Sequence, residues 1–191
     1  MNEQHRIVSS ESEELILVDH DDKETGYISK ADAHDGAGVL HRAFSLFLFN
    51  DEGELLLQKR APGKRLWGGC WSNSCCSHPR RGETLALAAT RRMRDELNLE
   101  TELEHVYWFC YQANFGDIGA ENELCHVYLG RVSGNVRPNE SEIEAIRYVS
   151  PAQLAKEFLE HPERFTPWFR QEWRELTSTY RERTKRYCDP A

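Results

Sequence analysis

The chain has 191 residues, of which 39% are apolar and 29% are charged, and its formal net charge is −8. This length and composition are typical of one ordinary globular domain with a substantial core. The sequence contains no apolar run of about 18 residues, so we expect no membrane-spanning helix. The overall acidity argues against general binding to nucleic acid.

Residues 1–14 are polar and acidic, and they lack the apolar stretch of a secretory signal. We therefore expect a flexible N-terminal tail at 1–14 and a single domain at 15–191, in a monomeric cytoplasmic protein. Six cysteines are present, and they are unevenly spaced: Cys70, Cys75, Cys76, Cys110, Cys125 and Cys188. Disulfide-rich domains are usually small and secreted, so free thiols are predicted here. A cysteine zinc site is disfavoured because no Cys-x2-Cys pair is matched by a second pair.

Short apolar segments predict strands in the first part of the chain. An apolar run at 15–18 is followed by a turn at 20–26, and Tyr27 begins either a second strand or a loop. The segments 43–49 and 54–60 are predicted to be strands joined by a hairpin turn at 50–53, where an Asn-Asp-Glu-Gly sequence stands.

The second half combines helices with further strands. Apolar residues recur at helical spacing over 84–97, and Asn98 stands where a left-handed residue would end that helix. Strands are predicted at 106–113, 124–132 and 145–149. A capping-box pattern opens a helix at Ser150 that runs to about 161, and a last amphipathic helix is predicted from 166 to about 187. This order predicts an α+β fold.

Positive charge is concentrated in one part of this acidic chain. The segment from Lys59 to Arg94 contains nine basic residues and one acidic residue, Glu83. Its net charge is therefore +8, and the remainder of the chain carries −16. A local cationic patch suits a small polyanion such as a diphosphate. For Arg91, Arg92 and Arg94 alone, a solvated helix face is an equally good interpretation.

Histidines and carboxylates suggest a metal site. On one helix His34 and His41 would be about 10.5 Å apart, but Gly36 and Gly38 favour a loop that could bring both rings together. His78 lies in the basic segment, and the carboxylates of Glu121 and Glu123 would share one face of a strand. Three histidines and two carboxylates would make an octahedral N3O2 site with room for one more ligand. Taken separately, surface histidines and an exposed acidic turn are the simpler interpretation.

The predicted helix at 84–97 lies within a longer motif. Its spacing resembles the Nudix box, Gly-x5-Glu-x7-Arg-Glu-U-x-Glu-Glu-x-Gly-U, where U is aliphatic. Ser77 stands at the first Gly, Arg92 at the Glu after the first Arg, Asp95 at a later Glu, and Asn98 at the last Gly. Since one metal-binding carboxylate has become a cation, the sequence resembles a Nudix fold used for something other than hydrolysis.

Six segments together resemble the type 1 isopentenyl-diphosphate isomerases. They are HDGAGVLHRAFSLFLFN, LLLQKRAPGKRLWGGCW, SNSCCSHPRRGE, RRMRDELNL, ENELCHVY and FTPWF, and the match runs from about Lys30 to Phe169. The resemblance implies a Nudix-like mixed β-sheet sandwich with flanking helices. It also implies interconversion of isopentenyl and dimethylallyl diphosphate through a tertiary carbocation, which feeds isoprenoid biosynthesis.

The resemblance also assigns roles to individual residues. Cys76 and Glu123 would add and remove the proton, with Tyr111 assisting. A divalent manganese, zinc or magnesium ion would be held by His34, His41, His78, Glu121 and Glu123. A Mg²⁺ ion on the substrate diphosphate would be positioned by Glu96 and the Cys76 backbone carbonyl. The substrate itself would be bound by Lys30, Arg60, Lys64, Ser77, Arg92 and Trp168, the last as an aromatic wall beside the carbocation.

The assigned role of Cys76 implies an expectation about the pKa of its thiol. Because cationic and metal neighbours lower a thiol pKa, we expect a lowered pKa for Cys76.

Two alternative functions remain, namely a Nudix hydrolase acting on a nucleoside diphosphate derivative and a non-enzymatic metal-binding or scaffold protein on the same fold. Release of phosphate would indicate the first alternative, and metal binding without turnover would indicate the second.

Overall fold

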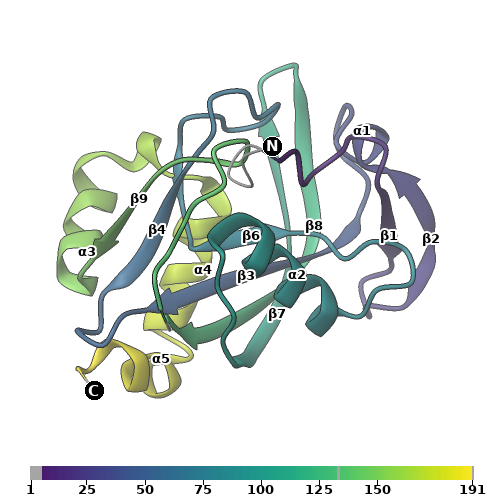
Figure 1. The fold of residues 1–191 in the computed structure, drawn as a ribbon. Helices are drawn as coiled ribbons and strands as arrows, with labels where there is room; N and C mark the ends of the chain where they lie inside the picture. Colours follow the sequence, from purple (N-terminus) through teal and green to yellow (C-terminus); the bar gives the residue numbers. More distant parts are fainter. Residues whose placement is uncertain (1–5, 133, 191) are drawn as a thin grey trace.

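The computed structural model describes residues 6–132 and 134–190, which form a mixed β-sheet with helices on both faces (Figure 1). Its strands are β1 (Glu14–Val18), β2 (Glu24–Ser29), β3 (His41–Phe49), β4 (Leu55–Arg60), β5 (Trp71–Ser72), β6 (Cys75–Ser77), β7 (Leu103–Phe115), β8 (Gly119–Arg131) and β9 (Ile143–Val149). Its helices are α1 (Lys30–Ala33), α2 (Leu85–Leu97), α3 (Pro151–Glu160), α4 (Pro167–Thr177) and α5 (Arg181–Cys188), with a short 3₁₀ turn at Pro162–Arg164.

Strand β3 is the centre of the fold and is buried on both faces. It pairs in parallel with β8 along its whole length and antiparallel with β6. Phe47 and Phe49 pack on one face against Trp173 of α4, whereas Phe44 and Leu46 belong to the core under α2 on the other face. Two-sided burial explains why β3 is an almost continuous apolar run, and it produces the predicted arrangement of a sheet between helices.

Helix α2 begins and ends where the sequence predicts. The Thr84 hydroxyl accepts a hydrogen bond from the backbone N–H of Leu87 at 3.3 Å, which caps the first turn. Asn98 ends the helix in the left-handed conformation, with φ of 55°. The buried face of α2 includes Ala88, Met93 and Leu97, the residues whose spacing predicted the helix.

The last predicted helix is in fact two helices. Helix α4 ends at Thr177 and α5 begins at Arg181. The Thr177 hydroxyl donates to the backbone carbonyl of Trp173 at 2.7 Å, and the Ser178 hydroxyl donates to that of Arg174 at 2.6 Å. Hydroxyl groups that compete for helical carbonyls in this way weaken a helix. The prediction of one continuous helix to about 187 was therefore wrong.

Helix α4 carries a completely buried carboxyl group. Glu172 is 0% exposed, its Oε1 lies 3.4 Å from the Cys125 sulfur, and its Oε2 has no hydrogen-bond partner among the described residues. Burial raises the pKa of Glu172 to about 8. The folded protein therefore keeps this proton at pH values where the unfolded chain has released it.

We expect Glu172 to make folding stability depend on pH. The folded-state pKa is raised, so the contribution of this proton is complete below about pH 4.5 and is lost as pH rises to about 8. The Glu172→Gln variant should lack this loss, which amounts to at most about 1.4 kcal/mol per pH unit. Urea unfolding at pH 5 and pH 8 measures it, with Glu175→Gln as the control on the same helix. Parallel pH dependence in wild type and Glu172→Gln would contradict the expectation.

Candidate active site and metal centre

A cavity of about 540 Å³ opens beside α1, β6, the β7–β8 hairpin and the start of α4. Twelve of the residues predicted from the sequence line it: Lys30, His34, Arg60, Lys64, Cys76, Ser77, His78, Arg92, Tyr111, Glu121, Glu123 and Trp168. Two predicted residues, His41 and Glu96, are buried but do not line the cavity. The structure therefore brings nearly all of the predicted site into one space, with Cys76 and Glu123 on the same cavity.

The histidines reach one point because the chain turns back after α1. His34 ends α1, and Gly36 and Gly38 follow with φ of 58° and 73°, left-handed values that favour glycine. The chain then enters β3 at His41, which is the register partner of Glu123 on the parallel strand β8. The loop expected between the two histidines is confirmed, and their ring centroids lie 5.1 Å apart.

The five side chains His34, His41, His78, Glu121 and Glu123 form a compact cluster. Their candidate ligand atoms all lie within 4.8 Å of one another. The Nε2 atoms of His34 and His78 lie 2.9 Å from Glu121 Oε2 and 2.8 Å from Glu123 Oε1, respectively. Meanwhile Nδ1 of His34 and of His41 lies 2.7 Å from a backbone carbonyl oxygen. A proton on each Nδ1 leaves Nε2 free as an acceptor, as a metal ligand requires.

Several buried polar atoms of this cluster lack the partner that a bound metal ion would supply. Nε2 of His34, Nε2 of His41 and Oε2 of Glu121 are buried and make no hydrogen bond of good geometry with the described residues. The 2.9 Å approach of His34 Nε2 to Glu121 Oε2 is an ion-pair contact. Such orphaned polar atoms are rare in folded proteins, and a divalent cation would satisfy all three. Burial, reinforced by neighbouring histidines, lowers the pKa of His41 to about 4 and that of His78 to about 3. Burial also acts to lower the pKa of His34, but the charge of Glu121 outweighs it and raises that pKa. His41 and His78 are therefore neutral imidazoles beside carboxylates, a donor set that a divalent metal takes.

The two carboxyl groups of the cluster differ in their electrostatics. Burial, followed by the charge of Glu121, raises the pKa of Glu123 to about 7. Burial acts in the same direction on Glu121, but the adjacent His34 outweighs it and lowers the Glu121 pKa well below its usual range. The Tyr111 hydroxyl donates to Glu123 Oε2 at 2.5 Å. Glu123 is thus a buried, hydrogen-bonded carboxyl that faces the cavity.

Cys76 lies on the short strand β6, where alternate side chains point to opposite faces. Cys75 is buried in the core under α2, whereas Cys76 lines the cavity with its sulfur 3.9 Å from Arg60 Nη1. Burial raises the pKa of the Cys76 thiol to about 12, because desolvation outweighs the opposing charge of Arg60. The expectation of a lowered pKa was therefore wrong. All six cysteines are free thiols, as predicted.

Four cations, Lys30, Arg60, Lys64 and Arg92, also line the cavity and are called the cationic wall below. The Arg60 guanidinium lies 5.3 Å from the centre of the Trp168 ring and donates to the Leu66 carbonyl at 3.0 Å. No carboxylate in 6–132 or 134–190 pairs with Arg60, so its charge faces the cavity uncompensated. Trp168 is 3% exposed and packs edge-on against Trp67, with their ring centroids 5.3 Å apart.

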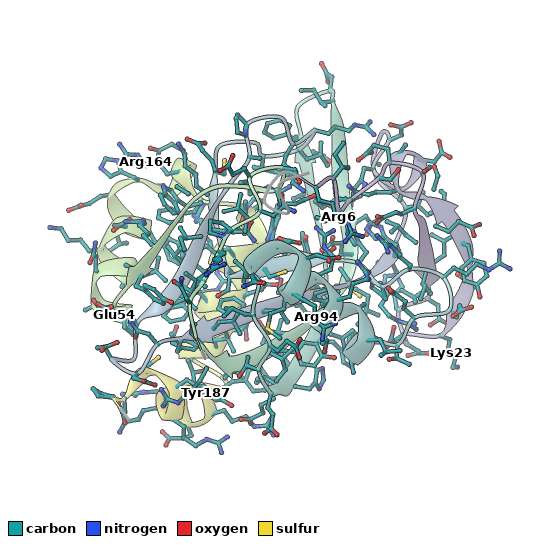
Figure 2. The ribbon with its side chains drawn as sticks, viewed as in Figure 1. Arg6, Lys23, Glu54, Arg94, Arg164 and Tyr187 are labelled. Atoms are coloured by element: carbon teal, nitrogen blue, oxygen red, sulfur yellow. The ribbon has the colours of Figure 1, made fainter. Side chains whose placement is uncertain are left out.

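The arginines of α2 lie in different surroundings. Arg94, labelled in Figure 2, is exposed and pairs with Glu100, as a solvated helix face predicts. Arg92 is buried instead, and its Nε donates to Glu96 Oε1 at 2.8 Å. Arg92 also lies 3.3 Å from Glu142 Oε2. The surface interpretation therefore holds for Arg94 and fails for Arg92, and the Glu96 carboxylate is already bound by Arg92.

The N-terminal segment covers part of the cavity. The Val8 carbonyl accepts a hydrogen bond from Arg92 Nη1 at 2.6 Å. Ser9 Oγ and Glu11 Oε1 lie 2.7 Å and 3.0 Å from Lys30 Nζ. Within the predicted tail, residues 6–14 therefore pack on the domain, and β1 begins at Glu14. Residues 1–5 lie outside the described part of the chain.

Sequence reasoning missed two residues at this site. Glu142 is buried and pairs with Lys64, but the polar segment 139–144 contains three glutamates and gives no signal that one of them is buried. Trp67 supports Trp168 and has a φ of 47°, which is unusual for a residue other than glycine. The Gly-Gly pair after Trp67 predicts a turn there, but not that this tryptophan enters the core.

Comparison with known proteins gives consistent matches. The NUDIX domain profile matches residues 39–169. The chain is 39% identical over 171 residues to "Isopentenyl-diphosphate Delta-isomerase 1" of Photorhabdus laumondii, covering 88% of this chain and 97% of that protein. It is 42% identical over 175 residues to "Isopentenyl-diphosphate Delta-isomerase" of Serratia proteamaculans, covering 91% and 97%.

Solved structures share the fold. A Deinococcus radiodurans crystal structure superimposes with a TM-score of 0.64 at 25% identity, covering 78% of this chain and 90% of that one. A MutT protein from Methanosarcina mazei superimposes with a TM-score of 0.57 at 17% identity, covering 77% and 94%. In the described part of the chain, each helix is too short or too polar to cross a bilayer.

Proposed function

Because this chain belongs to the NUDIX family and, within it, to the isopentenyl-diphosphate Delta-isomerases, we propose that it interconverts isopentenyl diphosphate and dimethylallyl diphosphate. The observation that carries this proposal is one cavity lined by a thiol, a carboxyl and four cationic side chains, with Arg60 Nη1 3.9 Å from the Cys76 sulfur. That arrangement suits a small prenyl chain with an anionic head.

The reaction moves a double bond by adding one proton and removing another. A proton adds to the terminal methylene carbon, and a tertiary carbocation forms at the adjacent carbon. A proton then leaves the carbon next to the one that bears the diphosphate, and its C–H electrons form the new double bond. Cys76 and Glu123 are the proposed pair for these two transfers, and the Tyr111 hydroxyl holds the Glu123 carboxyl in place at 2.5 Å. Trp168 presents an aromatic ring to the cationic carbon.

A divalent metal at the cluster would be held by His34, His41, His78, Glu121 and Glu123. When bound, it would supply positive charge that favours the ionised form of its carboxylate ligands and orients them. The orphaned Nε2 and Oε2 atoms support this assignment. Manganese, zinc and magnesium are the proposed candidates.

The diphosphate would lie on the cationic wall. Lys30, Arg60, Lys64 and Arg92 are the proposed ligands, with Ser77 contributing its hydroxyl. A Mg²⁺ ion on the diphosphate would use the Cys76 backbone carbonyl and Glu96. For Glu96 this requires its carboxylate to exchange part of its contact with Arg92, since Glu96 does not line the cavity.

Incubation with isopentenyl diphosphate and Mg²⁺ in heavy water tests the proposed function. We expect dimethylallyl diphosphate with deuterium in a methyl group, because the added proton comes from an exchangeable group. Release of phosphate without movement of the double bond would instead indicate a hydrolase. Bound metal with no turnover would indicate a non-enzymatic protein.

We expect the Arg60→Ala variant to raise KM for isopentenyl diphosphate with a smaller effect on kcat. Arg60 faces the cavity without a carboxylate partner, so its main contribution is to ground-state binding of the anion. Losing one charge-assisted contact should raise KM by about tenfold or more. Steady-state kinetics measures the change, with Arg94→Ala as the control on the exposed side of α2. A lowered kcat with unchanged KM would contradict this role.

A further inference from the structure

A buried carboxylate with no assigned role lies at the cationic wall of the cavity. Glu142 immediately precedes β9, lines the cavity, and its side chain is 5% exposed. It pairs with Lys64 Nζ, and its Oε2 lies 3.3 Å from Arg92 Nη2. Glu142 therefore contacts two of the four cations proposed to bind the diphosphate.

These cations need such a partner because they are buried together. Lys64 and Arg92 lie with Arg60 around one cavity, and Arg92 is 2% exposed. Burial, reinforced by Arg60 and Arg92, lowers the pKa of Lys64 to about 7. The nearby Glu96 carboxylate opposes that shift. A carboxylate in direct contact with both Lys64 and Arg92 reduces the repulsion between the two cations. Without the Glu142 carboxylate, the Lys64 ammonium and the Arg92 guanidinium would repel each other and gain by moving apart.

The backbone of Glu142 anchors the same part of the fold independently of its side chain. Its carbonyl accepts a hydrogen bond from the Ala61 N–H at 2.9 Å, and the Ala61 carbonyl accepts one from the Lys64 N–H at 3.1 Å. The Glu142 N–H donates a hydrogen bond to the Asn139 carbonyl at 3.0 Å. These contacts survive a change of side chain, so a substitution tests the carboxylate rather than the loop.

We propose that Glu142 is a positioning residue for diphosphate binding, and that its carboxylate holds the Lys64 ammonium and the Arg92 guanidinium side by side on the cavity wall. This inference rests on the proposed function, since it takes the cationic wall as the diphosphate site. The carboxylate itself does not touch the reacting carbons. Its loss should therefore weaken binding of the anion far more than it slows the chemical step.

The test is binding of inorganic diphosphate with Mg²⁺, measured by titration calorimetry on the full chain. The Glu142→Gln variant keeps the size of the side chain and removes its charge. We expect its dissociation constant for inorganic diphosphate to rise about tenfold. We expect KM for isopentenyl diphosphate to rise in parallel, with kcat within about threefold of wild type.

Matched variants separate positioning from general destabilisation. Glu144, two residues further on, pairs at 2.8 Å with Lys59 outside the cavity, so Glu144→Gln should bind inorganic diphosphate like wild type. Glu142→Asp keeps the charge but is shorter, and it should give an intermediate dissociation constant. If Glu142→Gln does not fold, the Asp variant decides. Binding equal to or tighter than wild type in the folded variant would overturn the proposal.

The same experiments distinguish this inference from the proposed function. Wild-type protein that binds inorganic diphosphate but leaves isopentenyl diphosphate unchanged would refute the isomerase proposal and leave the role of Glu142 in anion binding testable. Wild-type protein that isomerises its substrate, together with a Glu142→Gln variant of unchanged affinity, would refute only the role of Glu142.

Discussion

Replacing Cys76 with alanine is expected to lower kcat for isomerisation by about 10²- to 10⁴-fold, the range that a positioned acid or base contributes. The thiol lines the cavity that also contains the Glu123 carboxyl, and no other cysteine does so among the described residues. Cys76 also packs in part against the core beside α4, so the variant leaves a small void and a modest loss of stability.

Activity should be measured alongside metal content and thermal unfolding of the Cys76→Ala variant. Because no side-chain atom of Cys76 belongs to the histidine and carboxylate cluster, metal content should stay at the wild-type level. Cys110→Ala is the control, since Cys110 is exposed on β7 and lies away from the cavity. Near-native turnover by folded Cys76→Ala would remove the thiol from the mechanism.

Replacing Glu123 with glutamine should reduce kcat by a similar factor, of about 10²- to 10⁴-fold. The amide keeps the size of the side chain and can still accept a hydrogen bond from Tyr111, but it cannot carry the proton. Glu123 also belongs to the candidate metal cluster, so the variant should bind a divalent ion more weakly. Because Glu123→Gln should affect both proton transfer and metal binding, a comparison with a second variant is needed to separate these two effects.

Glu121→Gln provides that comparison. Glu121 belongs to the same cluster, but its carboxylate faces His34 and has no proposed role in proton transfer. At saturating metal we expect Glu121→Gln to regain much of its activity and Glu123→Gln to stay inactive. The activity and the bound metal of each variant should be measured over a range of Mn²⁺ concentrations. Recovery of Glu123→Gln at high metal would assign Glu123 to metal binding alone.

Several elements of this protein follow from short stretches of sequence. Helix α2 begins after Thr84 and ends at Asn98 because a hydroxyl cap, a left-handed stop and a periodic apolar face lie within 15 residues. The turn between His34 and His41 follows from two glycines in the same way. Backbone preference and apolar periodicity act over one or two turns of chain, so the local sequence is sufficient to specify them.

Two element boundaries, the start of β8 and the end of α4, differ from those that the local sequence predicts. The segment 119–123 is polar and glycine-containing, so a strand beginning near 124 was expected, yet β8 starts at Gly119 and carries Glu121 and Glu123. Pairing with the long strand β7 extends it. The last predicted helix also ends earlier than expected, after Thr177. There a side-chain hydroxyl donates a hydrogen bond to a helical carbonyl, and the apolar pattern of the sequence does not reveal this contact.

The sequence by itself determined the fold class and most of the secondary structure, and its resemblance to a family supplied the residues proposed for the site. Only the tertiary structure decided that His41 pairs in register with Glu123, that burial raises the pKa of Cys76, and that Arg92 is held by Glu96 and Glu142. The physical reason is that convergence, desolvation and charge pairing depend on groups far apart in the chain. Their energies arise only when the sheet and α2 have packed together.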